Sequence, residues 1–398
     1  MTNRERVTTL GRWLVLGALV GALSGAASAL FLWLLERATS LRMAHDQLVF
    51  ALPVAGLLIG GLYERYGHAI RAGNNLIIDT IHDDRPALPL RLAPMVLIGT
   101  VLTHVLGGSA GREGTAVQMG AGLADTLAQR LRLGQPLRRQ LLMAGAAGGF
   151  GSVFGTPLAG AVFGLEFSTF RRIQYQALVP ALVASLVGDR TTRALGIHHT
   201  PYPSLRALPL TPLLLGKWLL FALAVAAVTV VFVELVHGLK RHGERLIPRL
   251  PLRMCLGGAV VVGMWQLVGT SDYLGLGVPT IVRAFSDPSL PVTAFTWKLL
   301  FTVVTLAAGF LGGEVTPLFF VGAALGNVLA RLLGIPLELA AGVGLAAVFG
   351  AAANTPIALS IMAVELFGIA ILPHVALVTV VAYVLSGRRG IYSAQRMP

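Results

Sequence analysis

Residues 156–166, Thr-Pro-Leu-Ala-Gly-Ala-Val-Phe-Gly-Leu-Glu, recur half a chain length later as Thr-Pro-Ile-Ala-Leu-Ser-Ile-Met-Ala-Val-Glu at positions 355–365. The threonine, the proline, the alanine and the final glutamate keep their places at an offset of 199 residues (355 − 156). Upstream, Glu113-Gly114-Thr115 is matched by Glu314-Val315-Thr316 at an offset of 201 residues (314 − 113). Two collinear matches at nearly the same shift indicate that the chain is internally duplicated.

The composition is that of a polytopic membrane protein. Of the 398 residues, 55% are hydrophobic and only 12% are charged, and the mean hydropathy is +0.75. A soluble domain carries about 25% charged residues. Forty-seven glycines fit close helix packing in lipid. We therefore predict apolar helices over 13–36, 47–64, 92–107, 115–130, 137–150, 156–170, 174–189, 211–238, 252–269, 294–311, 315–333, 337–353, 355–370 and 372–386.

Several of these segments are shorter than the ~20 residues that span a bilayer. Helices that stop inside a membrane are tolerated only around a cavity enclosed by protein, which is typical of a transporter or channel. We expect one all-α transmembrane domain over residues 1–398, with a first repeat at about 11–200 and a second at about 205–398. The last apolar segment ends about a dozen residues before the end of the sequence, so no cytoplasmic regulatory domain is expected.

The net charge of +13 comes from basic residues that lie between the apolar segments, as in Lys240, Arg241, Arg245, Arg249 and Arg253. This distribution agrees with the positive-inside rule and with attraction to anionic lipid headgroups. It predicts a multi-pass protein of the cell membrane, which in a bacterium is the inner membrane. No basic stretch is interleaved with aromatic residues in a soluble context, so nucleic acid is not an expected partner.

The first half carries a candidate anion site at Gly107-Gly108-Ser109-Ala110-Gly111-Arg112-Glu113-Gly114-Thr115. A glycine-rich stretch that enters a helix presents free N–H groups and the positive end of the helix dipole. The carboxylate of Glu113 would compete with an anion for that place. It would then leave when protonated and return when ionised, as a gate and proton carrier in one group. The alternative is a glutamate that only stabilises the start of its own helix.

The second half repeats the pattern at Gly312-Gly313-Glu314-Val315-Thr316-Pro317. An ionisable residue between two apolar membrane segments is by default a functional candidate, and the alternative for Glu314 is a helix-capping carboxylate. We interpret Glu166 and Glu365 as structural acceptors for backbone N–H groups of neighbouring broken helices. His104, inside an apolar segment, is interpreted as a hydrogen-bonded helix residue.

An enzyme is not expected. Ser109 and Ser152 have no partner histidine at helical spacing, as a nucleophile would require. His198-His199 has no cysteine or carboxylate nearby in the sequence, so neither a metal site nor a cofactor is expected. The single cysteine, Cys255, forms no intrachain disulfide.

These motifs resemble those of the CLC (chloride channel/antiporter) family. Gly111-Arg112-Glu113-Gly114 is similar to its GREG signature, Gly312–Pro317 to its second anion motif, and Ile391-Tyr392-Ser393 to its C-terminal tyrosine segment. The resemblance implies a fold of two inverted halves whose broken helices meet at a central anion site, in a homodimer with one pathway per subunit. It implies Glu113 as the gating glutamate and Tyr392 as an anion ligand. It also places the other anion-binding residues at Gly111, Arg112, Gly114, Thr115, Val315 and Thr316.

Three departures from the chloride-type members resemble the fluoride-exporting branch. The serine motif of the first anion site is replaced by Arg71-Ala72-Gly73-Asn74-Asn75-Leu76, where Asn74 is the expected anion ligand and Asn75 or Ala72 are the alternatives. Thr115 replaces the proline after the signature, and Phe167 stands where chloride/proton exchangers carry a second glutamate.

The resemblance therefore implies antiport of fluoride against protons across the membrane, which would make cells resistant to fluoride. In that branch the residue at the position of Glu314 takes part in proton coupling. The alternative is a chloride/proton antiporter or a passive chloride channel.

Overall fold

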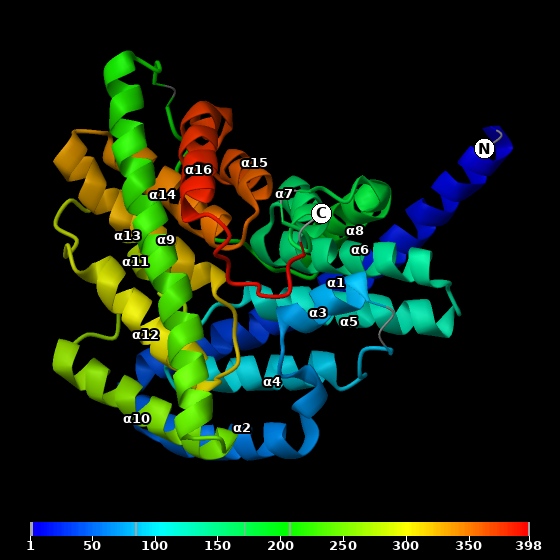
Figure 1. Ribbon diagram of the computed structural model, residues 1–398, viewed down its shortest axis with the longest axis horizontal. Helices are drawn as coiled ribbons and strands as arrows, with labels where there is room; N and C mark the ends of the chain where they lie inside the picture. The colour runs from blue at the N-terminus through cyan, green and yellow to red at the C-terminus, as the bar shows by residue number, and fades with distance from the viewer. Residues whose placement is uncertain (1–2, 84–85, 171, 207, 397–398) are drawn as a thin grey trace.

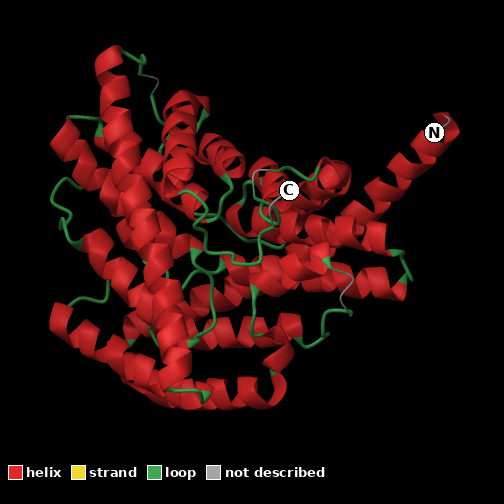
Figure 2. Cartoon of the chain, in the orientation of Figure 1, coloured by secondary structure: helices red, strands yellow, loops and turns green. Residues whose placement is uncertain are grey.

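The computed structural model describes residues 3–83, 86–170, 172–206 and 208–396, and within these ranges the chain is helical without a β-strand (Figures 1 and 2). The α-helices are α1 (Asn3–Ala44), α2 (Leu52–Tyr66), α3 (Asn74–His82), α4 (Leu92–Val105), α5 (Glu113–Arg130), α6 (Gln135–Phe154), α7 (Pro157–Glu166), α8 (Leu178–Ala194), α9 (Pro212–Leu246), α10 (Leu250–Val268), α11 (Val278–Arg283), α12 (Ala294–Ala308), α13 (Val315–Leu333), α14 (Leu337–Ala352), α15 (Pro356–Phe367) and α16 (Leu372–Ser386). Each of the fourteen predicted segments overlaps one of these helices.

Two helices were not predicted. α3 has nine residues and α11 has six, so neither offers an apolar run long enough to stand out in the sequence. The missed α3 matters for the site, because Asn74 is its first residue rather than part of an open loop.

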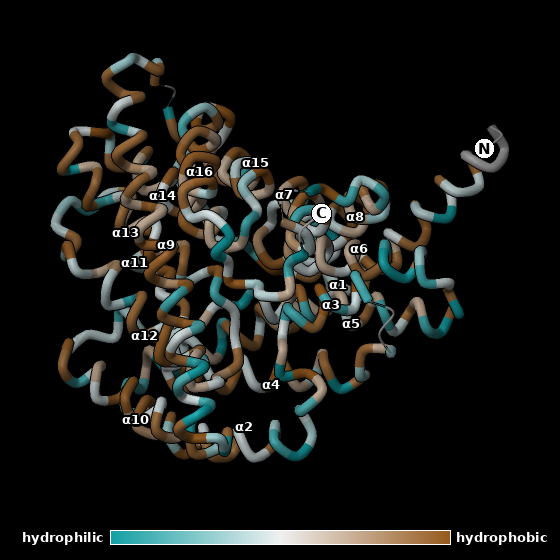
Figure 3. The backbone as a smooth tube through the Cα atoms, viewed as in Figure 1, coloured by the Kyte–Doolittle hydropathy of each residue, from teal (hydrophilic) through white to brown (hydrophobic). Residues whose placement is uncertain are grey.

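Among the described residues, six helical segments are long and apolar enough to cross a membrane: Val7–Ala44, Asp46–Tyr66, Pro212–Leu246, Leu250–Val268, Val315–Leu333 and Ile369–Ser386. Others are much shorter. The ten residues of α7 rise about 15 Å, half of a hydrocarbon core about 30 Å thick. Figure 2 shows the consequence, because loops gather in the centre of the protein where the broken helices end. In Figure 3 brown runs along α10, α14, α15 and α16, and the basic C-terminal end of α9 is teal.

The duplication read from the sequence recurs in the packing. α5 packs on α6 and α6 on α7, and in the same order α13 packs on α14 and α14 on α15. Glycines bring both pairs together: a Cβ on Gly120 would clash with the carbonyl of Gly145, and one on Gly322 would clash with that of Gly344. The two halves meet where α7 contacts α15.

Two carboxylates fasten this junction reciprocally. Glu166, the last residue of α7, accepts hydrogen bonds from the N–H groups of Ile357 (3.3 Å) and Ala358 (2.9 Å) in the first turn of α15. Glu365, near the end of α15, accepts from Leu158 (2.9 Å) and Ala159 (2.7 Å) in the first turn of α7. The structural role predicted for both glutamates is confirmed. Each carboxylate satisfies N–H groups that a helix leaves without an internal partner.

We predict that Glu166→Ala destabilises the protein. Two N–H groups at the start of α15 would lose their acceptor inside the protein, at about 1–3 kcal/mol for each buried group that stays unpaired. The measurement is thermal unfolding of the purified protein in detergent. Glu36→Ala is the matched control, because Glu36 is exposed on α1. Equal melting temperatures for the two variants would contradict the capping role.

Candidate functional site

The two glycine-rich motifs lie against each other. Gly111 and Gly313 form an isolated antiparallel bridge, in which the N–H of Gly111 donates to the carbonyl of Gly313 (2.6 Å) and the N–H of Gly313 donates to that of Gly111 (2.8 Å). The bridge sets the start of α5 beside the start of α13. Free N–H groups and the positive ends of two helix dipoles therefore face one small volume, which favours an anion there.

Glu113 places its carboxylate in that volume. The side chain is fully buried. Its Oε1 accepts from the Thr316 hydroxyl (2.5 Å), and its Oε2 accepts from the backbone N–H of Thr316 (3.1 Å) and of Arg112 (3.1 Å). The Arg112 guanidinium adds a positive charge 3.4 Å from Oε1. The carboxylate thus binds the start of α13, in the other half of the protein, and not only its own helix.

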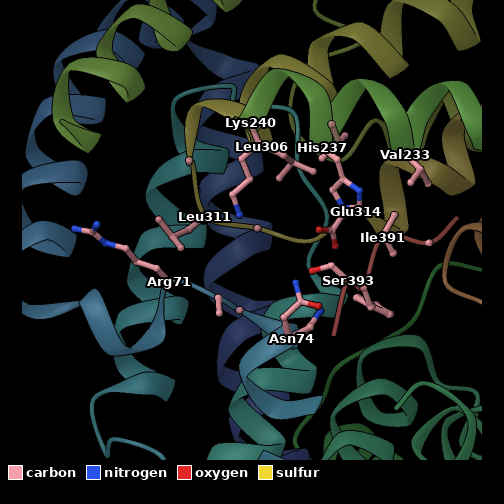
Figure 4. Close-up of a pocket in the computed structure, with 18 of the residues that line it drawn as sticks. Arg71, Asn74, Val233, His237, Lys240, Leu306, Leu311, Glu314, Ile391 and Ser393 are labelled. Atoms are coloured by element: carbon pink, nitrogen blue, oxygen red, sulfur yellow. The ribbon is translucent and has the colours of Figure 1, made fainter. Parts of the chain in front are cut away.

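Glu314 has a different environment. It is the N-cap residue of α13, yet its side chain makes no capping hydrogen bond, so the alternative of a simple capping carboxylate is not what the structure shows. The side chain is partly buried and lines a cavity of about 960 Å³. Figure 4 shows Glu314, Asn74 and Ser393 pointing toward one another in this cavity, from the start of α13, from α3 and from the C-terminal segment.

The cavity is lined by both halves and is rich in basic residues. Six basic side chains line it, and only three carboxylates do so. The basic residues are Arg71, Lys240, Arg241, Arg253, Arg388 and Arg389, and the acidic residues are Glu234, Glu244 and Glu314. Such a surplus of positive charge raises the local concentration of anions. Among the predicted site residues, the lining includes Asn74, Asn75, Thr115 and Tyr392, whereas Glu113 is not part of it.

Asn74 and Tyr392 are buried side by side at the wall of the cavity. They are 8% and 4% exposed, and their side chains interact with each other. The side-chain oxygen of Asn74 (Oδ1) has no hydrogen-bond partner among the described residues. Asn75, in contrast, uses its side-chain oxygen to accept from the N–H of Ala394 (3.0 Å), so this amide anchors the C-terminal segment.

The remaining predicted residues surround Glu113. Thr115 is buried, and its hydroxyl bonds to that of Thr100 (2.7 Å). Val315 is buried at the first position of α13, where the backbone N–H has no partner within the helix. Gly114 is packed so closely that an added Cβ would lie 3.1 Å from the Asn74 amide nitrogen and 3.2 Å from Cα of Gly313.

His104 behaves as predicted. The buried ring bonds through Nδ1 to the carbonyl of Thr100 (2.7 Å) and through Nε2 to the carbonyl of Ala110 (2.9 Å), so it supports the first glycine motif from α4. His199 lies in a loop, and the fold brings a carboxylate oxygen of Asp189 to 3.7 Å from its Nε2. No group of three metal-ligating side chains occurs within the ranges that the structure describes.

Comparison with known proteins decides the family. The sequence pattern of the family described as voltage gated chloride channel matches residues 55–387. A chloride/fluoride channel protein of Pseudomonas syringae pv. tomato is 47% identical over 98% of this chain and 87% of its own length. The chain therefore belongs to the CLC family.

Solved structures agree with this membership. A CLC-type fluoride/proton antiporter is 36% identical and superposes with a TM-score of 0.95, covering 100% of both chains. A slow cyanobacterial Cl⁻/H⁺ antiporter, 21% identical over 96% of both chains, has the same fold with a TM-score of 0.83. The CLC fold of two inverted halves with broken helices at a central anion site is thus the fold of this multi-pass membrane protein.

Phe167 has an environment unlike that of an ionisable group in this CLC protein. The ring is fully buried and stacks on the ring of Phe163, with 5.2 Å between the ring centroids. Phe163 stacks in turn on Phe150, with 4.2 Å between their centroids. A carboxylate in this apolar column would be costly. Phe167 is at the position where chloride/proton exchangers carry a second glutamate. In this protein an apolar ring is packed there instead of a proton-carrying group.

Sequence reasoning missed Asn354 and Gln395, two amide side chains that bond to each other (2.8 Å) beside the tyrosine segment. The available signal was weak. It consisted of two amides within strongly apolar, glycine-rich surroundings, with no motif that joins them.

We predict that Gly111→Ala disrupts the crossing of the two motifs. An added Cβ would lie 2.9 Å from Oε2 of Glu113, 3.0 Å from the carbonyl of Gly313 and 3.0 Å from Pro317. These groups are held by the bridge and by α13, so the two loops would move apart. We expect a lower melting temperature and a lower yield of monodisperse protein in size-exclusion chromatography. Gly61→Ala is the control, because nothing lies within 4 Å of its added Cβ, and similar behaviour of both variants would show that the contact is dispensable.

Proposed function

We propose that this CLC protein exchanges fluoride for protons across the cell membrane and so exports fluoride from the cell. The observation that carries the proposal is the Glu113 carboxylate, which is bound by the Thr316 hydroxyl and N–H at the start of α13 as an anion would be. Support comes from the 47% identical chloride/fluoride channel protein and from the fluoride/proton antiporter of the same fold.

The geometry suggests how one carboxylate couples the two ions. While ionised, Glu113 fills the site and closes it. Protonation removes the negative charge and weakens the charge-assisted hydrogen bonds from Thr316 and Arg112, so an anion can take the place of the carboxylate. When the anion leaves, the ionised carboxylate returns and its proton is released. Each cycle then moves an anion and a proton in opposite directions.

We propose that fluoride reaches this site through the basic cavity, past Asn74 and Tyr392. Fluoride is small and strongly hydrated, so it needs hydrogen-bond donors that replace its water. The Asn74 amide and the Tyr392 hydroxyl supply such donors at the cavity wall, together with the first N–H groups of α13 around Val315 and Thr316. Asn75 is the weaker candidate, because its amide already anchors Ala394.

We place the cavity on the cytoplasmic side of a bacterial inner membrane. The basic C-terminal end of α9 and the pair Arg388-Arg389 lie at this cavity, as the positive-inside rule favours. We further propose a homodimer with one pathway in each subunit. Exposed apolar residues on the outer sides of α15 and α16, namely Ile357, Leu372, Val380 and Val384, offer a surface for a second copy.

The direct test is ion efflux from liposomes that contain the purified protein and are loaded with fluoride or with chloride, with proton uptake followed in parallel. We expect fluoride efflux far above chloride efflux, accompanied by proton uptake. Comparable, proton-coupled movement of chloride would favour the chloride/proton antiporter instead. Rapid chloride flux without protons would favour a passive channel, and no flux of either anion would refute transport by this pathway.

Glu113→Gln should abolish proton coupling. The amide keeps the size of the side chain but carries no titrating proton and no negative charge at the start of α13. We expect proton uptake driven by a fluoride gradient to be lost in the liposome assay, and any fluoride flux to be independent of the pH gradient. An unchanged ratio of protons to fluoride would show that Glu113 is not the proton carrier.

Glu314→Gln should impair proton transfer while it leaves the anion site intact. Glu314 lines the cavity and is not among the groups that bond to Glu113. We expect proton uptake to fall more than fluoride binding, which isothermal titration calorimetry can measure separately. Glu234→Gln is the matched control at the mouth of the same cavity, because Glu234 is exposed and pairs with Arg389. Equal effects of the two substitutions would indicate a merely electrostatic role for Glu314.

A further inference from the structure

The C-terminal strap, residues 390–396, follows α16 and runs into the centre of the protein, where Figure 1 shows it in red between the two halves. It contains no regular helix within the described residues, yet it carries Tyr392 to the wall of the ion cavity. The position of the Tyr392 hydroxyl therefore depends on the groups that bind the strap.

Gln395 makes the densest set of these contacts. Its Nε2 donates to the carbonyl of Phe167 at the end of α7 (2.9 Å) and to the carbonyl of Ala353 after α14 (2.8 Å). Its Oε1 accepts from the Asn354 amide (2.8 Å). One side chain thus ties the strap to a broken helix in each half of the chain.

Asn354 is held in place for this contact. It is 3% exposed and has a left-handed backbone (φ 57°) between α14 and α15, a conformation that asparagine tolerates better than most residues. The neighbouring carbonyl of Ala352 accepts from the N–H of Ile391 (2.9 Å). Tyr392 therefore lies between two anchors, one at Ile391 and one at Gln395.

A backbone turn connects Gln395 directly to Tyr392. The backbone N–H of Gln395 donates to the carbonyl of Tyr392 (3.2 Å), so the two residues belong to one turn of the strap. Two further side chains hold the strap: Asn75 accepts from the N–H of Ala394 (3.0 Å), and Asp83 pairs with Arg396 (2.7 Å). The side chains of Arg396 and Asp83 are 46% and 35% exposed. Exposed ion pairs contribute little to stability, so the amide clamp contributes more to the strap's position than this ion pair does.

We propose that Gln395, held by Asn354, is a positioning residue that sets the place of the Tyr392 hydroxyl beside Asn74 at the wall of the cavity. This inference rests on the proposed function, because the effect it assigns to the clamp is on ion and proton coupling. Without the amide, the carbonyls of Phe167 and Ala353 lose their donor, and the strap is free to move with its tyrosine. The consequence is slower turnover and a changed ratio of protons to fluoride.

The test is Gln395→Met, which keeps an unbranched side chain of similar length and removes the donors and the acceptor. We expect fluoride turnover in liposomes to fall about tenfold or more, because two carbonyls lose their donor and the strap that carries Tyr392 loses the contacts that hold it. Asn354→Gly should cause a similar change, because glycine keeps the left-handed backbone and lacks the amide. Arg396→Ala on the same strap is the control and should retain normal turnover.

A double-mutant cycle with Tyr392→Phe separates positioning from general damage. If Gln395 acts through the tyrosine hydroxyl, Gln395→Met should add little to the defect of Tyr392→Phe. Defects that multiply, in variants with normal melting temperatures, would overturn the proposal, as would normal turnover and stoichiometry in Gln395→Met.

A second readout does not depend on transport. With 3-fluorotyrosine incorporated at position 392, the ¹⁹F resonance should shift or broaden in Gln395→Met and stay unchanged in Arg396→Ala. An unshifted resonance in Gln395→Met would refute the clamp even if the wild type exchanges fluoride. A shifted resonance in a protein that moves no fluoride would leave the positioning intact and reject the proposed function instead.

Discussion

A carboxylate bound to the free N–H groups of a helix that begins inside the protein is the interaction on which this structure depends. Three contacts of this kind lie around the centre of the protein: Glu166 binds the start of α15, Glu365 binds the start of α7, and Glu113 binds the start of α13. Helices that stop inside a membrane leave N–H groups that neither lipid nor water satisfies. In each case the glutamate comes from the opposite half of the chain, so the same contact that satisfies the helix start also joins the halves.

The three carboxylates differ in a way that supports the gate role proposed for Glu113 alone. Glu166 and Glu365 lie at the ends of short helices that pack on each other, so neither can leave without separating α7 from α15. Glu113 instead begins its own helix, directly after a glycine-rich loop. In the proposed cycle its side chain would swing without moving α5, and Arg112, 3.4 Å from its carboxylate, would stabilise an anion that replaces it. The same kind of contact therefore fixes the helix junction at Glu166 and Glu365, whereas at Glu113 it forms the gate that we propose.

Much of this could be predicted from the sequence because the duplication preserves local chemistry. Thr-Pro starts and glutamate ends at the same spacing predicted that Glu166 and Glu365 bind N–H groups of neighbouring broken helices, as the structure shows. The two glycine motifs predicted helix starts suited to an anion, and the bridge between Gly111 and Gly313 emerged only from the structure. What the pattern could not give were contacts made by single residues without a repeat. Three features depend on how distant segments meet, which no sequence periodicity encodes. They are the nine-residue helix α3, the different contacts of Asn74 and Asn75, and the hydrogen bond between Asn354 and Gln395.

The aromatic column at Phe167 constrains the proton pathway further. Phe150, Phe163 and Phe167 fill the space beside α7 with apolar rings, so the position of Phe167 itself offers no group that could accept a proton. Among the described residues, Tyr392 and Glu314 line the basic cavity, whereas Tyr202, a further titratable group near Glu113, does not line it. A proton that moves by way of Tyr392 and Glu314 would use the same opening as the anion, in the opposite direction. The ionised Glu113 carboxylate and an anion cannot occupy the site at the same time. In the cycle that we propose, exchange follows from that competition, since protonated Glu113 vacates the site that fluoride needs, and ionised Glu113 refills it. The clamp on Tyr392 gains its importance from this shared route, because a displaced tyrosine disturbs both ions together.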